Sequence, residues 1–90
     1  VPTHHVLIKN KLGLHARAAV QFVRIAKQFP CQILIGINEK SLVDGKNIMS
    51  VMMLAASQGT WLQLETCGYK EKEALLELET LINNYFNESQ

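Results

Sequence analysis

The chain has 90 residues, of which 48% are hydrophobic and 19% are charged, and its formal net charge is +1. This composition is typical of one small globular domain spanning residues 1–90, and it excludes an intrinsically disordered chain. The charge balance lacks the basic surplus of a nucleic-acid-binding protein. The longest apolar run, at 33–37, is too short for membrane insertion, and the N-terminus has no signal-peptide pattern, so we expect a cytoplasmic protein.

The first predicted elements are a strand and a helix. The strand is expected at 5–8 and ends at the turn-like segment 10–13. A helix is predicted at 16–28, because apolar side chains recur there at helical spacing, and Pro30 ends it. The apolar stripe consists of Ala19, Phe22, Val23, Ala26 and Phe29.

A β-hairpin is predicted next. Three isoleucines at alternate positions indicate a strand with one strongly apolar face. Turn residues follow at 38–40, and a short return strand is expected at 41–43, where Asp44 breaks the pairing. The three residues on the apolar face are Ile33, Ile35 and Ile37.

A short second helix is predicted at 46–56, with Asn47 as its N-cap. Its apolar residues outnumber the positions on one face. An inward stripe is expected to consist of Val51, Leu54 and Ala55. The remaining methionines and Ile48 then face solvent or a partner, which favours a docking surface, since methionine adapts to different partners. The alternative is a helix buried on two sides.

The last elements are a strand at 60–67 and a helix from 70 to about 86. Trp61 is expected to pack on the sheet, since no basic residues alternate with aromatic ones around it as in a nucleic-acid site. The core stripe of the helix is predicted to be Ala74, Leu78, Leu81, Ile82 and Tyr85. Residues 83–90 are expected to fray.

These elements define an α+β fold with the order β-α-β-β-α-β-α. The hairpin and the long helical crossovers predict an open-faced β-sandwich, in which a four-stranded antiparallel sheet is covered on one face by three helices. The other face of the sheet is expected to be open to water.

The candidate functional residue is His15, which follows Gly13 at the bend before the first helix. Backbone N–H groups at a helix start lack intrahelical partners, and the helix dipole favours negative charge there. Arg17 adds a fixed positive charge in the first turn. This arrangement suits a histidine that carries a phosphoryl group, although a histidine at this place can also be a simple polar turn residue.

Three blocks of the chain resemble one family. The segment Gly13-Leu14-His15-Ala16-Arg17-x-Ala19 is similar to the active-site signature of HPr proteins, the histidine phosphocarriers of the bacterial phosphotransferase system. The other two blocks are Lys46-Asn47-Ile48-Met49-Ser50-Val51-Met52-Met53-Leu54 with Gln58-Gly59, and Gly68-x-x-Glu71-x-x-Ala74. They occur in the family's order and spacing over nearly the whole chain, and the lead-in at 10–13 leans toward the proteobacterial or nitrogen-related branch.

The resemblance implies a carrier protein that is not itself an enzyme. Nδ1 of His15 would accept a phosphoryl group from enzyme I and pass it to an EIIA-type protein. Arg17 would balance the charge, and the backbone N–H groups of Ala16 and Arg17 would bind phosphate oxygens. The partner-docking positions implied by the family are Ile48, Met49 and Met52. We expect a monomer that needs no cofactor and no metal.

This chain departs from the family pattern at three positions. Ala18 stands where a proline is usual, which we expect to leave the start of the helix less rigid while activity is kept. Asn47 stands where regulated carriers have a phosphorylatable serine, so we expect no regulatory serine here. Ala55 replaces a common glycine, and we expect packing to absorb that change.

Four alternatives remain. A regulator could dock on partners without carrying phosphate, and Ala18 keeps this hypothesis open. An acylphosphatase-like hydrolase would need a glycine-rich anion loop with an arginine, and the one candidate loop holds His15. A metal site is disfavoured, because His4 and His5 would point to opposite faces of a strand. Cys31 and Cys67 lack a Cys-x-x-Cys spacing, so two free thiols are expected.

Overall fold

A computed structural model describes residues 2–87 of the chain. The predicted order of elements is confirmed, and one short 3-10 helix follows the last α-helix. The elements are β1 (Thr3–Leu7), α1 (Ala16–Ala26), β2 (Gln32–Gly36), β3 (Val43–Asp44), α2 (Ile48–Met53), β4 (Trp61–Cys67), α3 (Glu71–Asn83) and η1 (Tyr85–Asn87). Among the described residues, no helix has both the length and the apolar character needed to cross a bilayer.

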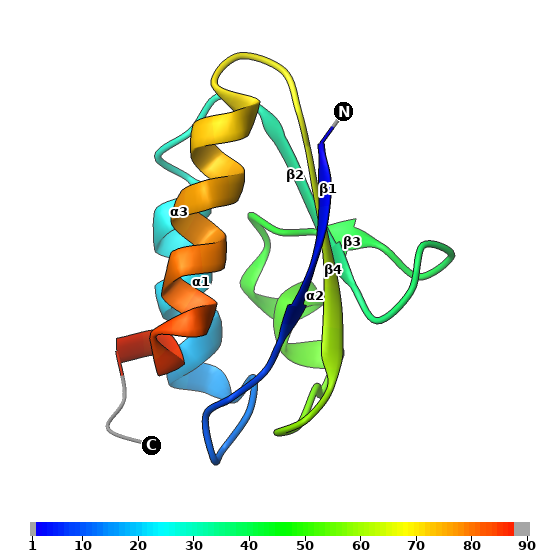
Figure 1. Ribbon diagram of the computed structural model, residues 1–90, viewed down its shortest axis with the longest axis vertical. Helices are drawn as coiled ribbons and strands as arrows, with labels where there is room; N and C mark the ends of the chain where they lie inside the picture. The colour runs from blue at the N-terminus through cyan, green and yellow to red at the C-terminus, as the bar shows by residue number, and fades with distance from the viewer. Residues whose placement is uncertain (1, 88–90) are drawn as a thin grey trace.

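The four strands form one sheet in the order β1-β4-β2-β3, and every neighbouring pair is antiparallel. The last strand of the sequence therefore lies between the first two. Figure 1 shows α1 and α3 together on one side of this sheet, while the connection from β2 to β3 projects away from them. The predicted open-faced α+β sandwich is confirmed.

The core lies between the sheet and the helices. Strand residues alternate between the two faces, so every second side chain of β4 is buried, beginning with Leu62. The helices contribute small and large apolar side chains from one face each, which include Phe22 of α1 and Leu78 of α3. Trp61 lies on the other face of the sheet and is exposed. One side of the molecule is therefore built for packing, and the opposite sheet face is open to solvent.

Helix α1 is shorter than the predicted 16–28. Its last residue is Ala26, after which Gln28 N–H bonds to Ile25 O and Phe29 N–H bonds to Ala26 O in a tighter turn. Phe29 is only partly buried. Its carbonyl accepts a hydrogen bond from Lys46 Nζ at 2.7 Å, which joins the end of α1 to the segment between β3 and α2.

The hairpin differs from the prediction in register. Strand β2 ends at Gly36, where an added Cβ would lie 2.6 Å from the Ser41 carbonyl oxygen. The chain turns away after this close approach, so Ile37 is exposed and does not join the apolar face. The return strand is Val43–Asp44, later than the predicted 41–43, because Val43 is the residue that pairs with Ile35.

Helix α2 is also shorter than predicted, with six residues. It ends because Ala55 adopts a left-handed conformation with φ of 50°. Ala55 is exposed, so its predicted place in the inward stripe is wrong, and Ala56 is the buried alanine. The expectation that packing absorbs the glycine replacement is also incomplete, since the change acts on the backbone.

The C-terminal segment differs from the predicted helix and frayed end. Helix α3 stops at Asn83, and residues 85–87 all have positive φ. This left-handed turn carries Phe86 into the core with 2% of its surface exposed, whereas Tyr85 is 38% exposed. The predicted core position of Tyr85 is therefore wrong by one residue. Residues 88–90 lie outside the described residues.

The two cysteines are free thiols that differ in exposure. Cys67 pairs with Gln32 at the end of β4 and is exposed. Cys31 precedes Gln32 and is buried. The Cys67 thiol is therefore accessible to solvent, whereas the Cys31 thiol is covered by the core.

Candidate functional site

The loop before α1 is fixed by backbone and side-chain hydrogen bonds. Gly13 N–H bonds to Asn10 O at 3.2 Å, and Asn10 Nδ2 donates to Gly13 O at 2.7 Å. Gly13 has φ of +68°, and a Cβ there would lie 2.5 Å from the Ala56 carbonyl oxygen. Only glycine fits this conformation and this close approach. The loop that joins β1 to α1, which can be followed in Figure 1, therefore contacts the segment after α2.

His15 is the N-cap of α1, as the motif predicts. Its backbone is extended, with φ of −82° and ψ of −179°, and its carbonyl accepts the first helical bond, from Ala19 N–H at 2.9 Å. Its ring nitrogen Nδ1 accepts a hydrogen bond from Arg17 N–H at 3.3 Å. The neutral ring therefore carries its proton on Nε2, and the Nδ1 lone pair points at the start of the helix.

The first turn of α1 has the properties of an anion site. Helical bonding starts only at Ala19, so the N–H groups of residues 16–18 precede the backbone ladder. This turn contains no acidic residue, and the side chain of Arg17 is exposed beside it. The partial positive charge of the helix end and the guanidinium group therefore act on the same small region as His15.

Ala18 is 1% exposed and belongs to the core, a role that its position in the motif did not indicate. It lies in the first turn, before the first helical hydrogen bond. The helix forms over this position without proline. With alanine at this position, His15 still caps the helix and Arg17 N–H still bonds to its Nδ1.

Helix α2 exposes apolar side chains, as the sequence predicts. Met49 is 65% exposed, Ile48 is also exposed, and Met52 is half-buried because it packs partly on the core. Met53 is 79% exposed and extends the same apolar patch, although the family resemblance did not include it. Exposure of this many apolar side chains on one short helix is typical of an interaction surface.

Asn47 caps α2 as predicted, because its Oδ1 accepts a hydrogen bond from Ser50 N–H at 3.1 Å. Sequence reasoning missed two other residues near the site. Leu12 is exposed at the tip of the loop, and Asn10 is fully buried within it. An Asn-x-x-Gly segment is typical of a turn, but no sequence signal shows that its amide is buried.

The other two histidines lie on β1. His4 Nδ1 is 2.9 Å from Glu79 Oε2 of α3, so His4 contacts a helix rather than standing alone at the N-terminus. His5 faces the other side of the sheet and is exposed. Within residues 2–87, no three His, Cys, Asp or Glu side chains are grouped where they could hold a metal ion.

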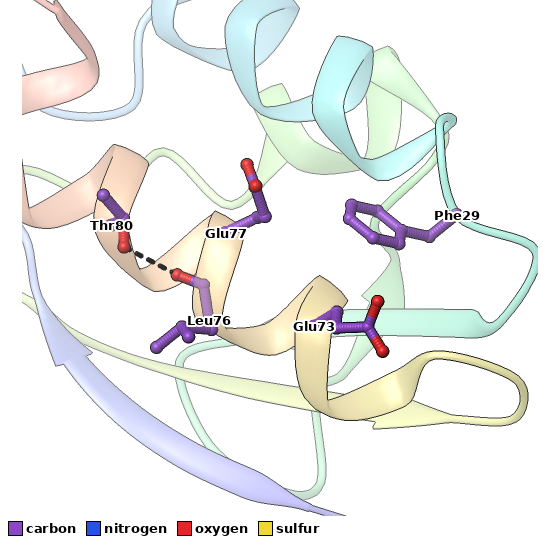
Figure 2. A pocket seen from close by; sticks show the side chains of 5 residues that line it. All are labelled: Phe29, Glu73, Leu76, Glu77 and Thr80. Carbon is purple, nitrogen blue, oxygen red and sulfur yellow. Dashed lines mark hydrogen bonds between the residues drawn. The ribbon is translucent and has the colours of Figure 1, made fainter.

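A shallow depression of about 340 Å³ lies at the opposite end of α1 from His15. Figure 2 shows its lining from α3 and from the turn after α1. The lining residues are Phe29, Glu73, Leu76, Glu77 and Thr80. Two carboxylates would repel a phosphate group, so this depression does not contribute to anion binding.

Comparison with known proteins identifies the family of the chain. Residues 2–84 match a family model described as the PTS HPr component phosphorylation site. The phosphocarrier protein HPr of Pseudomonas aeruginosa is 56% identical over 90 residues, which cover 100% of both chains. That of Pseudomonas putida is 51% identical over the same length and coverage. The phosphocarrier protein NPr of Escherichia coli is 31% identical over 83 residues and 92% of each chain.

Solved structures show the same fold. HPr-C-His from Thermoanaerobacter tengcongensis matches with a TM-score of 0.93 and 39% identity over 100% of both chains. The structure of an HPr dimer from that organism matches with a TM-score of 0.76 and 42% identity, over 92% of this chain and 94% of that one. The buried stripes, the histidine cap and these relationships agree, and the chain belongs to the HPr family of phosphocarrier proteins of the phosphotransferase system.

Proposed function

We propose that this chain carries a phosphoryl group on Nδ1 of His15, which it accepts from enzyme I and passes to an EIIA-type protein. Enzyme I is itself charged by phosphoenolpyruvate. The observation that supports this most directly is the bond between His15 Nδ1 and Arg17 N–H. Nδ1 can accept this bond only when it carries no proton, and that is the form in which the nitrogen is a nucleophile.

In the proposed transfer, the Nδ1 lone pair attacks the phosphorus atom of the donor phosphohistidine. A new N–P bond forms on His15 as the donor N–P bond breaks, and its electron pair returns to the donor imidazole. At 3.3 Å the bond from Arg17 N–H to Nδ1 is long, so little is lost when it opens. That N–H group and Ala16 N–H then donate to phosphate oxygens, and the Arg17 side chain balances their charge.

The docking surface in this proposal consists of Ile48, Met49 and Met52. A phosphoryl carrier must bind two partners in turn and leave each of them, so a small apolar contact suits it better than a large permanent one. The loop with His15 is bonded to the segment after α2, because Leu14 N–H donates to Ala56 O at 2.8 Å. A partner on α2 would therefore meet the imidazole at a fixed distance.

We further propose that the chain acts as a monomer in the cytoplasm and is not switched at residue 47. Asn47 has no hydroxyl group to phosphorylate, and its amide already serves as the helix cap. A monomer leaves both the histidine and α2 accessible to successive partners. Sedimentation at working concentration tests this, since a stable dimer that covers α2 would contradict it.

The test of the proposed function is intact-mass spectrometry at neutral to alkaline pH after incubation with enzyme I, phosphoenolpyruvate and magnesium. We expect one acid-labile phosphate adduct on the unaltered chain and none on His15→Ala. The matched control is His5→Ala, which removes an exposed histidine from β1 and should keep the adduct. Absence of an adduct on the unaltered chain would favour a regulator that docks without phosphoryl transfer.

A further inference from the structure

Asn10 is a buried polar residue in the loop between β1 and α1, where its immediate neighbours in the sequence are exposed. It has 0% exposure, although Lys9, Lys11 and Leu12 around it are exposed. Burying an amide costs free energy unless hydrogen bonds replace its water contacts. An apolar side chain would fill the same space without that cost, so packing alone does not explain an asparagine here.

The amide of Asn10 acts on one particular peptide group. Its Nδ2 donates to Gly13 O at 2.7 Å, and the N–H on the other side of that peptide, that of Leu14, donates to Ala56 O at 2.8 Å. Both polar groups of the peptide between Gly13 and Leu14 are therefore bound, by two different segments of the chain. Two bonds in opposite directions fix the rotation of this peptide plane.

This peptide plane lies one residue before His15. Leu14 is the one residue between this peptide plane and His15, and its buried side chain holds it in place as well. A rotation of the plane would change the direction in which His15 leaves the loop. It would also move Nδ1 away from Arg17 N–H, which is 3.3 Å from it.

We propose that Asn10 is a positioning residue for His15, which it keeps aligned with the start of α1 by fixing the peptide between Gly13 and Leu14. This inference rests on the proposed function of His15. Asn10 itself touches neither the phosphoryl group nor the partner. Its loss would leave a chain that still folds and docks but presents a misdirected nucleophile.

The test compares Asn10→Leu and Asn10→Asp, which keep most of the volume but remove the donor, with Ile33→Val, a core truncation in β2. We expect both Asn10 variants to lower kcat for phosphorylation by enzyme I on the order of tenfold, with KM little changed, because a small misplacement of a reacting group is costly. Ile33→Val should change neither value.

Nuclear magnetic resonance separates this inference from the proposed function, since it needs no transfer. In both Asn10 variants we expect the Leu14 and Arg17 amides to exchange faster and the His15 ring to lose its preference for a proton on Nε2. If the unaltered chain accepts no phosphate, the proposed function fails while this spectroscopic result still stands. Variants that match Ile33→Val in kcat and in the His15 signals would overturn the inference.

One further measurement applies if the Asn10 variants do not fold. In the unaltered protein, a side-chain amide proton of Asn10 should be protected from exchange relative to those of the exposed Asn38. Equal exchange at the two side chains would contradict the bond to Gly13 and with it the positioning role.

Discussion

Leu14 donates its backbone N–H to the carbonyl oxygen of Ala56 at 2.8 Å, which joins the loop before α1 to the segment after α2. The proposed carrier histidine follows Leu14 directly, and the proposed docking helix ends three residues before Ala56. The loop that carries the proposed nucleophile and the segment that follows the proposed docking helix are therefore joined by a direct hydrogen bond. Changes on either side of this contact are expected to affect both.

Ala55 adjoins this contact and is predicted to be strained. A left-handed conformation costs an L-residue other than glycine about 1–2 kcal/mol. We expect Ala55→Gly to raise the free energy of unfolding by about 1 kcal/mol, since glycine adopts φ of 50° freely and is the usual residue after a helix end. Chemical denaturation measures this. Ala56→Gly is the control and should destabilise, so a loss of stability in both variants would contradict the assignment.

Ala18→Pro is predicted to stabilise the chain. The position precedes the first helical hydrogen bond, so no backbone bond is lost, and proline restricts the unfolded chain. We expect a gain of about 0.5 kcal/mol and a rise of a few degrees in Tm, measured by calorimetry. A large loss of stability would mean that the buried environment of Ala18 has no room for the ring.

The cap made by His15 can be separated from its proposed chemistry. Asparagine is among the strongest N-caps but cannot accept a stable phosphoryl group. Alanine neither caps a helix well nor accepts a phosphoryl group. We expect His15→Asn to exceed His15→Ala in stability by about 1 kcal/mol, while both lose the phosphate adduct. Equal stability of the two variants would show that residue 15 does not cap α1 in solution.

Met49→Glu is predicted to weaken docking to enzyme I roughly tenfold without unfolding the chain, because it places a charge in an apolar contact. Met49 is 65% exposed, so the free energy of unfolding should change by less than about 0.5 kcal/mol. Titration calorimetry measures the affinity. The matched control is Leu76→Glu, an equally exposed position on α3, and unchanged binding by both variants would exclude α2 as the docking surface.

The left-handed turn at the C-terminal end of the described chain gives a prediction about two neighbouring aromatic residues. We expect Phe86→Ala to cost about 3–5 kcal/mol, since its ring is buried in the core. Tyr85→Ala should cost less than about 1 kcal/mol, because Tyr85 is largely outside the core. Urea unfolding of both variants decides this, and the reverse order would restore the helical stripe expected from sequence.

The order of elements and the place of His15 could be predicted because they depend on local patterns. Helical spacing of apolar residues marked α1 and α3, alternation marked β4, and the glycine before His15 marked the bend. The cap of α2 was equally local, since Asn47 and Ser50 are three residues apart. In each case the residues that decide the structure are neighbours in the sequence.

The errors come from features that hydrophobic periodicity does not encode: close approaches of the backbone, left-handed turns and the packing of loops. Ile37 continued the alternation, but the close approach of Gly36 to Ser41 ended the strand before it. Tyr85 continued the helical spacing, but a left-handed turn placed Phe86 inside instead. The segment 10–13 reads as a turn, but nothing in the sequence indicates that the side chain of Asn10 is buried within it. Periodicity cannot report such tertiary constraints.

The sheet order places β4 between β1 and β2, and Thr3 of β1 pairs with Glu65 of β4. Strands β1 and β2 therefore do not pair with each other, and they are joined in the sheet only by β4, which is synthesised after both of them. Before β4 is made, the sheet against which the helices pack is incomplete. Folding of this domain is therefore expected to follow synthesis of β4 rather than to proceed element by element, and to be limited by closing that long loop.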